Sequence, residues 1–348
     1  MIQLARRALN NLTKVVLLVF TVFTLLIIAL AFTVYKPIRS TKTHHKYVVK
    51  PGEGLHKVAS RLHQASIVKY PRLFVIAYQL RYGNKALIPG RYLYHQGNSM
   101  ADLIQNHATS KRLYGKFTII EGWRWSQLYK ALISDNRLIP QSPQTLLRHF
   151  KLHDSCNQNP NPCFEGQFLA GTYYFYEEST ISSLLDQAHH AKNRLLQNLW
   201  QARNTNLEYQ TPEQALIIAS MVQRESSYTP EYSNIVSVIL NRLAIGMPLQ
   251  IDSCLHYGLN KHHQKLNYKD LKTPNEYNVY INKGLPPTPI SMVSEEAIKA
   301  SFSADPHTDY YYYVANDKGK HTFTKTHKDH VKHKLKFKQS KPGGGNNK

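Results

Sequence analysis

Apolar residues form one unbroken block near the start of the chain and recur at helix or strand spacing after it. Residues 15–35, VVLLVFTVFTLLIIALAFTVY, contain no charged side chain. A helix rises ~1.5 Å per residue, so this block spans ~30 Å, the thickness of a bilayer core. The block exceeds the usual apolar length of a signal peptide, and AFTVYKP is a poor cleavage site. We therefore expect an uncleaved transmembrane helix, with residues 1–14 in the cytoplasm.

The patterns after a polar linker, residues 36–45, predict a small α+β unit over residues 46–112. In YVVKPGEGLHKVASRLHQASIV, a strand and a Pro-Gly turn precede a helix with apolar residues at helical spacing. PRLFVIAYQLRYG predicts a second helix, PGRYLYHQG a second strand, and SMADLIQNH the start of a third helix. Residues 115–132, GKFTIIEGWRWSQLYKAL, repeat the strand, turn and helix. Units of this kind suit recognition of a repeating polymer or serve as spacers.

The largest block, residues 113–335, predicts a mixed α+β domain. Its segment TPEQALIIASMVQRESSY, residues 211–228, predicts a buried helix in which Thr211 is the N-cap and Gln214 completes a capping box. NIVSVILNRLAIGM predicts a second helix and DYYYYVAND a strand. Residues 336–348 are rich in Lys, Gly and Asn, and we expect them to be a disordered basic tail. The predicted fold class is α+β, with an N-terminal transmembrane helix, a small α+β domain and a larger mixed α+β domain.

The charge narrows the choice of partners. The chain has 44 Lys and Arg against 22 Asp and Glu, a net charge of +22. This charge favours a polyanion such as nucleic acid, anionic lipid or an acidic cell-wall polymer. The basic residues are spread along the chain without a nucleic-acid-binding signature, so we expect no nucleic-acid partner. Cys156 and Cys163 bracket the polar loop NQNPNP. They either form a disulfide in an oxidising compartment, which leaves Cys254 unpaired, or all three cysteines are free thiols.

One charged residue continues the apolar face of the helix predicted from Pro212 onwards. Glu225 lies three residues after Val222 and seven after Ile218, so all three share a face. Two environments are open to it: an ion pair with Arg224 or Arg242, or a cleft in which burial raises the pKa of its carboxyl. The second environment would suit a general acid near neutral pH.

Five stretches of the chain occur in the order, and near the spacing, of one enzyme family. They are IIEGWRWSQL, ALIIASMVQRESSY, VSVILNRLAIGMPLQIDSCLHYGL, TPNEYNVYINKGLPPTPISMVSEEAIKA and DYYYYVANDKGKHTFTKTHKDH. In these stretches the chain resembles the MltG/YceG-type endolytic lytic transglycosylases. The resemblance extends upstream to the apolar block and so covers nearly the whole chain.

The resemblance implies a single-pass protein of the bacterial inner membrane with a periplasmic catalytic domain. Such enzymes cut nascent peptidoglycan between N-acetylmuramic acid and N-acetylglucosamine and leave 1,6-anhydro ends. It implies that Glu225, paired with Ser226, is the catalytic acid, and that Gln223 stands where many members carry another Glu. It also implies that residues 46–112 are LysM-like. One carboxylate suffices for this chemistry because the sugar's own C6 hydroxyl acts as the nucleophile.

Other site candidates follow from residue type and from the resemblance. Amide and phenol groups of the loop NEYNVYINKGLPPTPI can orient an N-acetyl arm or stack on a sugar, or the loop is purely structural. Glu165 is a second-carboxylate candidate or a turn residue. Ala170 and Gly171 stand where the family has Pro and Asp, and Ile251 begins a stretch that replaces its Thr-Asp-Pro-Thr; these departures concern the rim of the cleft. The substrate-binding candidates are Ser226, Gln250, Asp252, Tyr257, Tyr277, Asn278, Tyr280 and Glu165.

The histidines near the C-terminus have a spacing that matches no standard metal site. They are His321, His327, His330 and His333. We therefore expect no metal, and the chemistry implied by the resemblance requires no organic cofactor. His321 and His330 match positions of the family, which implies a structural or cleft-lining role.

The sequence thus predicts a membrane-anchored endolytic murein transglycosylase that limits the elongation of glycan strands. Its expected partners are peptidoglycan glycan strands and the inner membrane, reached through residues 15–35, with peptidoglycan synthases as further candidates. Two alternatives stay open: a non-catalytic peptidoglycan-binding scaffold of the synthesis machinery, and a muramidase that hydrolyses with water.

Overall fold

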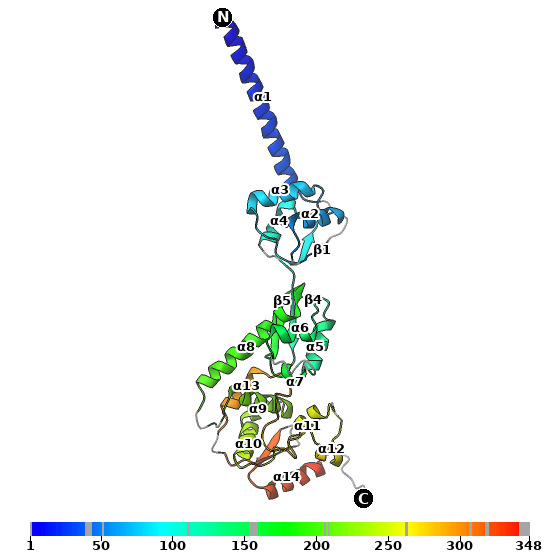
Figure 1. Cartoon of the computed structure of the whole chain (residues 1–348), viewed down its shortest axis with the longest axis vertical. Coiled ribbons are helices and arrows are strands. Elements are labelled where there is room, and N and C mark those ends of the chain that lie inside the picture. The colour runs from blue at the N-terminus through cyan, green and yellow to red at the C-terminus, as the bar shows by residue number, and fades with distance from the viewer. Residues whose placement is uncertain are drawn as a thin grey trace. The chain divides into compact units, whose positions relative to one another are not determined.

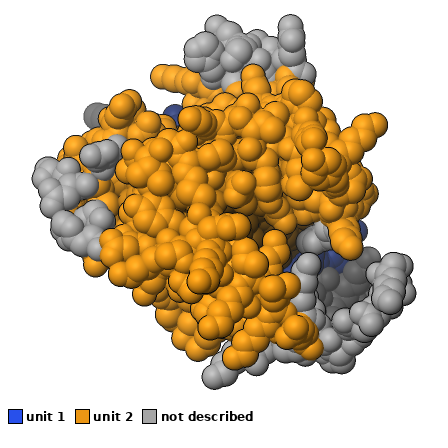
Figure 2. Space-filling model, turned by 90° about the horizontal axis from the view of Figure 1, so that it is seen from below, with its two compact units in different colours: residues 1–115, 176–179 blue, residues 116–175, 180–348 orange. Residues whose placement is uncertain are grey.

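The structure is a computed structural model that divides into two compact units (Figure 2). Unit 1 comprises Met1–Gly115 and Tyr176–Ser179, and unit 2 comprises Lys116–Phe175 and Thr180–Lys348. Both contain helices and short strands, so the predicted α+β class is confirmed. The residues that the structure describes are 2–38, 44–50, 52–109, 112–152, 159, 161–204, 207, 209–261, 264–305, 308–316 and 320–340.

Unit 1 begins with one long helix, α1 (Ile2–Tyr35). Its part Asn11–Tyr35, 25 residues, is long and apolar enough to cross a membrane by length and composition. Lys14 lies inside this part, which therefore begins slightly earlier than the block predicted from residue 15. Among the described residues, α1 is the one helix with these properties.

The remainder of unit 1 has the element order predicted for it (Figure 1). Strands β1 and β2 pair antiparallel from His44 opposite His95 to Val49 opposite Gly90. Three helices pack around a core of aromatic and aliphatic side chains. The likeness to a LysM unit stays a prediction. The elements are β1 (His44–Val49), α2 (Leu55–Gln64), α3 (Pro71–Tyr82), β2 (Gly90–His95) and α4 (Met100–Ala108).

Unit 2 contains two hydrophobic clusters, each built around one group of helices. The first is built on α5 and α8, where the Trp125 ring stacks on Phe164 with 4.0 Å between ring centroids. Strands β3 and β5 pair beside it. Its elements are β3 (Tyr114–Ile119), α5 (Trp125–Ser134), β4 (Leu138–Ile139), α6 (Pro143–His149), α7 (Asn161–Phe164), β5 (Gly171–Tyr176), β6 (Ser179–Thr180) and α8 (Ile181–Gln201).

The second cluster surrounds α9, the helix predicted to be buried. Every residue from Ala215 to Val222 is buried, so α9 is enclosed on all sides by its neighbours rather than on one face. The elements that follow are α9 (Pro212–Glu225), the 3-10 turn Thr229–Glu231, α10 (Tyr232–Ala244), α11 (Asp252–Gly258), α12 (Tyr268–Lys272), α13 (Glu295–Phe302), β7 (Tyr312–Ala315), β8 (His321–Thr324) and α14 (His327–Ser340).

Two local predictions differ from the structure. Thr211 is the N-cap residue of α9, but its hydroxyl makes no capping hydrogen bond. Gln214 Oε1 accepts the N–H of Gln210 instead, so the predicted capping box does not form. Helix α14 continues to Ser340, so residues 336–340 are helical rather than disordered, and residues 341–348 lie outside the described part of the chain.

The cysteines differ in state. Cys163 is disulfide-bonded, whereas Cys254 is a free, buried thiol. Cys156, the other half of the predicted bridge, lies outside the described residues. A disulfide at Cys163 is typical of a protein that folds in an oxidising compartment.

Candidate active site

Glu225 is the last residue of α9, and the helix end that carries it is held by the segment 290–294. The N–H of Ile290 donates to Ser220 Oγ over 3.0 Å. The N–H and the hydroxyl of Ser294 both donate to Gln223 Oε1, over 3.1 and 2.6 Å. Gln223 therefore joins α9 to the N-terminus of α13, which is a structural task.

The turn after β3 holds the same helix end from another direction. Arg224 donates to the carbonyl of Gly122 over 3.1 Å. The N–H of Gly122 donates to Met292 O over 2.9 Å, and the N–H of Met292 donates to Trp123 O over 2.7 Å. The motif EGW thus helps to fix the position of Glu225, through its backbone contacts with Met292 and the Arg224 side chain.

The Glu225 carboxyl is desolvated and accepts a hydrogen bond from a tyrosine. The Tyr313 hydroxyl, on β7, donates to Glu225 Oε2 over 3.1 Å. Burial raises the pKa of Glu225, and the nearby charge of Asp252 raises it further. The hydroxyls of Ser253 and Tyr313 and the His321 ring act in the opposite direction on this pKa. The carboxyl is therefore biased toward the protonated form but retains donors for the ionised form.

Of the two environments open to Glu225, the structure shows the desolvated one. Among the described residues, no arginine or lysine forms an ion pair with its carboxylate. Arg242 is buried and donates to the carbonyls of Tyr311 and Leu249 over 2.7 and 2.6 Å. Arg224 lies on the surface and holds Gly122.

The N-terminus of α11 lies beside Glu225. Asp252, its first residue, is exposed and accepts a short hydrogen bond from the Tyr280 hydroxyl. The Ser253 hydroxyl is buried and has no partner of normal hydrogen-bond geometry among the described residues. Because Ser253 nevertheless lowers the pKa of Glu225, its hydroxyl lies close to that carboxyl.

A partly buried histidine–glutamate contact supports the Tyr313 side of the site. His321 Nδ1 lies 2.8 Å from Glu231 Oε2, and the His321 N–H donates to Glu231 Oε1 over 2.9 Å. The His321 ring stands edge-on to Tyr313, with 5.4 Å between centroids. Glu231 thereby fixes the ring that packs against the tyrosine donor. His330 instead stacks on Tyr312, at 5.4 Å, so these two histidines have separate surroundings.

A groove of about 720 Å³ opens in front of Glu225. Ser226 and Ser227 continue its wall from the end of α9, and β3 and β5 supply the facing wall. Ser226 Oγ accepts the N–H of Tyr228 over 3.0 Å, and so it also shapes the turn after Glu225. Thr118 and Thr172 share a hydrogen bond of 2.9 Å on the exposed sheet surface inside the groove. This volume lies within the range usual for ligand pockets, about 300–1,000 Å³.

Glu165 belongs to a different buried group. Its Oε1 and Oε2 accept the N–H of Trp125 over 3.1 and 3.0 Å, at the start of α5. Tyr257 hydrogen-bonds to the same carboxyl, and the Arg124 guanidinium lies over the Tyr257 ring at 4.9 Å. Burial raises the pKa of Glu165 to about 8. Only 1% of Glu165 is exposed, so it holds the start of α5 rather than lining the groove.

The glycine after Glu165 permits a close chain crossing. Gly166 has φ +70°, and a Cβ there would lie 2.8 Å from both Cβ and Cγ of Pro289. The proline-rich loop can therefore pack directly on this turn only if the residue lacks a side chain.

The other predicted site residues lie in the loop around residues 275–282 or at its edge. Asn278 is fully buried, and its amide binds the carbonyls of Leu271 and Thr273 and the N–H of Tyr280. The Tyr277 hydroxyl bonds to Thr288 Oγ1 over 2.8 Å. Gln250 is exposed at φ +52°, and its N–H donates to Val279 O over 3.0 Å. The structure thus brings three predicted residues close to Glu225: Ser226, Asp252 and Tyr280. Three others, Glu165, Tyr257 and Tyr277, belong to the separate buried group around the Glu165 carboxyl.

Three residues of the site were not singled out from the sequence. Ser253 and Glu231 carry no motif, and Tyr313 lies in a run of four tyrosines. The alternation of side chains along the predicted strand DYYYYVAND gives the one usable signal, because it puts Tyr311 and Tyr313 on the same side.

Comparisons with known proteins concern the chain as a whole. A model of the YceG-like family matches residues 47–336. The endolytic murein transglycosylase of Bacillus subtilis is 27% identical over 319 residues, which are 87% of this chain and 87% of that protein. Two endolytic murein transglycosylases of Streptococcus pneumoniae, from strains D39 and R6, are each 26% identical over 334 residues, 85% of this chain and 59% of theirs. A crystal structure of a YceG-like protein from Listeria monocytogenes has the same fold, with a TM-score of 0.53 at 22% identity over 84% of this chain and 99% of that one.

Proposed function

The chain belongs to the YceG-like family, which confirms the resemblance seen in its motifs, and we propose that it is an endolytic murein transglycosylase. The names of the Bacillus and Streptococcus relatives support this activity. The observation that carries the proposal is the position of Glu225: a carboxyl with a raised pKa at the wall of a groove, with a tyrosine donor on one oxygen.

The proposed reaction uses Glu225 twice. Protonated Glu225 donates to the oxygen that bridges N-acetylmuramic acid and N-acetylglucosamine, and the bond from this oxygen to C1 breaks. The resulting carboxylate then takes the proton of the C6 hydroxyl of N-acetylmuramic acid, while the C6 oxygen forms a new bond to C1 of the same sugar. The products are a 1,6-anhydromuramoyl end and a free hydroxyl on the leaving sugar, and no water is consumed. The intramolecular nucleophile supplies the advantage of proximity.

The surroundings of Glu225 suit both halves of this cycle. Desolvation and the charge of Asp252 favour the proton that the first half requires. Tyr313 and Ser253 favour the carboxylate that forms in the middle. The opposing contributions keep both forms accessible, as a residue that is first an acid and then a base needs.

We propose that the groove binds the glycan strand next to Glu225, where Ser226 is the predicted substrate-binding residue in its lining. Asp252 and Tyr280 lie beside the acid outside that lining, and Gln250 precedes them on the surface. Glu165, Tyr257, Tyr277 and Asn278 act behind this wall, because their polar groups are occupied by internal hydrogen bonds.

The location is part of the proposal. The apolar part of α1 suggests a single-pass membrane anchor. We place residues 1–14 in the bacterial cytoplasm and the parts of both units that follow α1 in the periplasm, since a long soluble domain is translocated largely regardless of flanking charge. The disulfide at Cys163 supports an oxidising compartment. Glycan strands, and the synthases that make them, are then the partners within reach.

The second candidate is a muramidase, which the position of Asp252 favours, because hydrolysis of a glycosidic bond usually needs two carboxylates.

The deciding experiment digests purified sacculi with the full chain and measures the mass of the newly formed glycan ends. Anhydro ends, lighter by one water than reducing ends, support the transglycosylase. Reducing ends support the muramidase, and unchanged glycan supports a scaffold. Glu225→Gln is the matched inactive control, because it keeps the shape of the side chain and removes its proton transfer.

A further inference from the structure

Helix α3 of unit 1 is apolar on two opposite faces. A helix of this kind is typically enclosed on both faces. The inner face is buried in the unit 1 core through Phe74, Val75 and Tyr78. The outer face carries an apolar stripe, Leu73, Ile76, Ala77 and Leu80. Ile76 and Leu80 remain 52% and 84% exposed, whereas Leu73 and Ala77 are partly buried, so Ile76 and Leu80 are the uncovered part of the stripe.

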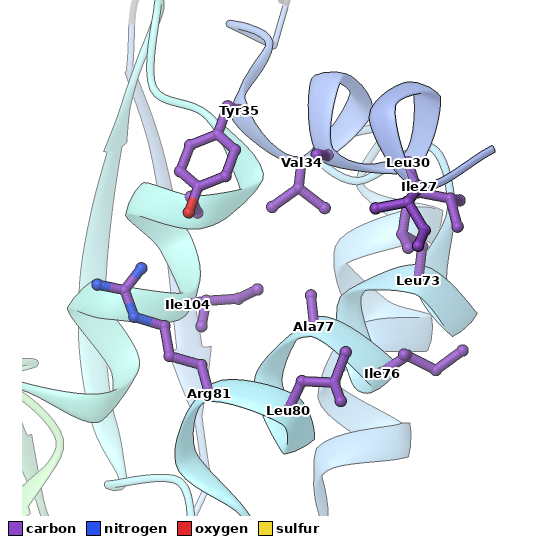
Figure 3. Close-up of a pocket in the computed structure, with 12 residues that line it drawn as sticks. Ile27, Leu30, Val34, Tyr35, Leu73, Ile76, Ala77, Leu80, Arg81 and Ile104 are labelled. Carbon is purple, nitrogen blue, oxygen red and sulfur yellow. The ribbon is translucent and has the colours of Figure 1, made fainter. Parts of the chain in front are cut away.

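The stripe forms one wall of a pocket of about 340 Å³, and α1 and α4 form the others (Figure 3). The pocket has two chemically different ends. Figure 3 shows the Arg81 guanidinium and the Tyr35 phenol at one side, and Ile27, Leu30 and Leu73 at the other. Polar groups therefore lie near the C-terminal end of α1, and apolar groups lie toward its middle.

The change from apolar to polar side chains along the pocket matches the change from acyl chains to headgroups across one lipid leaflet. Ile27 precedes Tyr35 by eight residues, which is ~12 Å along a helix. The apolar block 15–35 spans ~30 Å, so the apolar end of the pocket falls within the bilayer core. Its polar end falls at the boundary, where Tyr and Arg side chains are favoured. This placement rests on the membrane anchoring proposed above.

We propose that the pocket and the α3 stripe bind a phospholipid of the leaflet around the outer end of α1. One acyl chain covers Ile76 and Leu80 and enters between α3 and Ile27, and the headgroup phosphate pairs with Arg81. Unit 1 is then docked on the membrane surface through α3 as well as tethered by α1.

Charge favours an anionic headgroup over a neutral one. Lys36 directly follows α1, and Arg81 lies at the Tyr35 end of the pocket; both are exposed. These two basic side chains are therefore placed at the boundary, near the headgroups. A basic side chain near an anionic membrane surface strengthens binding to it.

The test reads the depth of single positions in the full chain, reconstituted in phosphatidylglycerol vesicles. Leu80→Cys, labelled with an environment-sensitive fluorophore, reports on the stripe. Gln64→Cys, exposed at the end of α2, is the matched control in the same unit, and Val22→Cys in α1 reports on the anchor. Cys254 is buried and Cys163 is disulfide-bonded, so neither competes for label.

The proposal expects acyl chains brominated near the headgroup to quench the label at position 80 strongly and to shift its emission to the blue, while position 64 is unaffected. Quenching at 22 without quenching at 80 overturns lipid binding by the stripe and leaves the anchor intact. Quenching at neither position overturns both.

A second measurement addresses the headgroup. With the label at position 80, quenching should be stronger in phosphatidylglycerol than in phosphatidylcholine vesicles, and Arg81→Gln should remove that difference. Equal quenching in both lipids for the unsubstituted Arg81 would overturn the assignment of the phosphate to this residue.

Discussion

Tyr313 donates a hydrogen bond to Glu225 over 3.1 Å, across 88 residues of sequence. The donor comes from β7 and the acceptor from the end of α9, so folding of unit 2 is what brings them together. The contact stabilises the carboxylate, whereas burial of Glu225 stabilises the acid. The balance between these two effects sets the pH range in which Glu225 can exchange a proton.

Tyr313→Phe should therefore slow cleavage of sacculi and move the alkaline limb of the pH profile to higher pH. The ring stays packed on His321, but the pKa of Glu225 rises because the carboxylate loses a donor. A hydrogen bond to a charged group is worth ~1.5–3 kcal/mol, so the rate should fall roughly 10- to 100-fold. Anhydro ends released per minute, measured across pH, check this. A limb that moves to lower pH would contradict the assigned role of the hydroxyl.

Asp252→Asn should have the opposite effect on the pH profile. The neighbouring negative charge raises the pKa of Glu225, so removing it lowers that pKa and moves the alkaline limb to lower pH. The Asn Oδ1 can still accept from Tyr280, so the local structure is retained. Activity below that limb should stay within a few-fold of wild type. A loss of several orders of magnitude at every pH would instead identify Asp252 as the second carboxylate of a muramidase.

Glu165→Gln should make stability less sensitive to pH. The pKa of Glu165 rises from its ordinary 4.5 to about 8 on folding, so the folded state binds a proton in this range. The stability associated with that proton is complete below about pH 4.5 and is lost as the pH rises through about 8. The amide stays neutral, so the melting temperature of the variant minus that of wild type should increase between these pH values. A constant difference would show that the Glu165 carboxyl ionises normally in the fold.

Gly166→Ala should destabilise unit 2, because the new Cβ would meet Pro289 at 2.8 Å in a backbone conformation with φ +70°. The expected loss is roughly 1–3 kcal/mol, seen as a melting temperature lower by several degrees. Gly54→Ala is the matched control: its φ is −73°, and no atom lies within 4 Å of the added Cβ. Equal melting temperatures for the two variants would contradict the close crossing of the loop and the turn.

The sequence predicted those parts of the molecule that depend on neighbours along the chain. Helices α2, α3, α9 and α10 and strands β1, β2 and β7 follow from the spacing of their apolar residues, and the position of Glu225 on α9 follows from the same spacing. The capping box did not form, because the Gln214 side chain binds the N–H of Gln210 instead.

The side chains that surround the Glu225 carboxyl could not be predicted from the spacing of residues along the chain. Ser253 and Tyr313 reach the carboxyl through tertiary packing that no local pattern encodes. Asn278 has a residue type suited to sugar binding, yet its amide binds the backbone of its own loop, and only the loop conformation decides this.

The contacts that shift the pKa of Glu225 also bear on when the site forms during folding. The groups that tune Glu225 come from α11, β7 and β8, the closing third of the chain, and contacts of such separation form late in folding. A partly folded chain carries only a helix ending in an ordinary glutamate. The protein is proposed to act after translocation across the membrane. Its catalytic activity should then depend on complete folding of unit 2, so that incompletely folded copies do not cleave peptidoglycan.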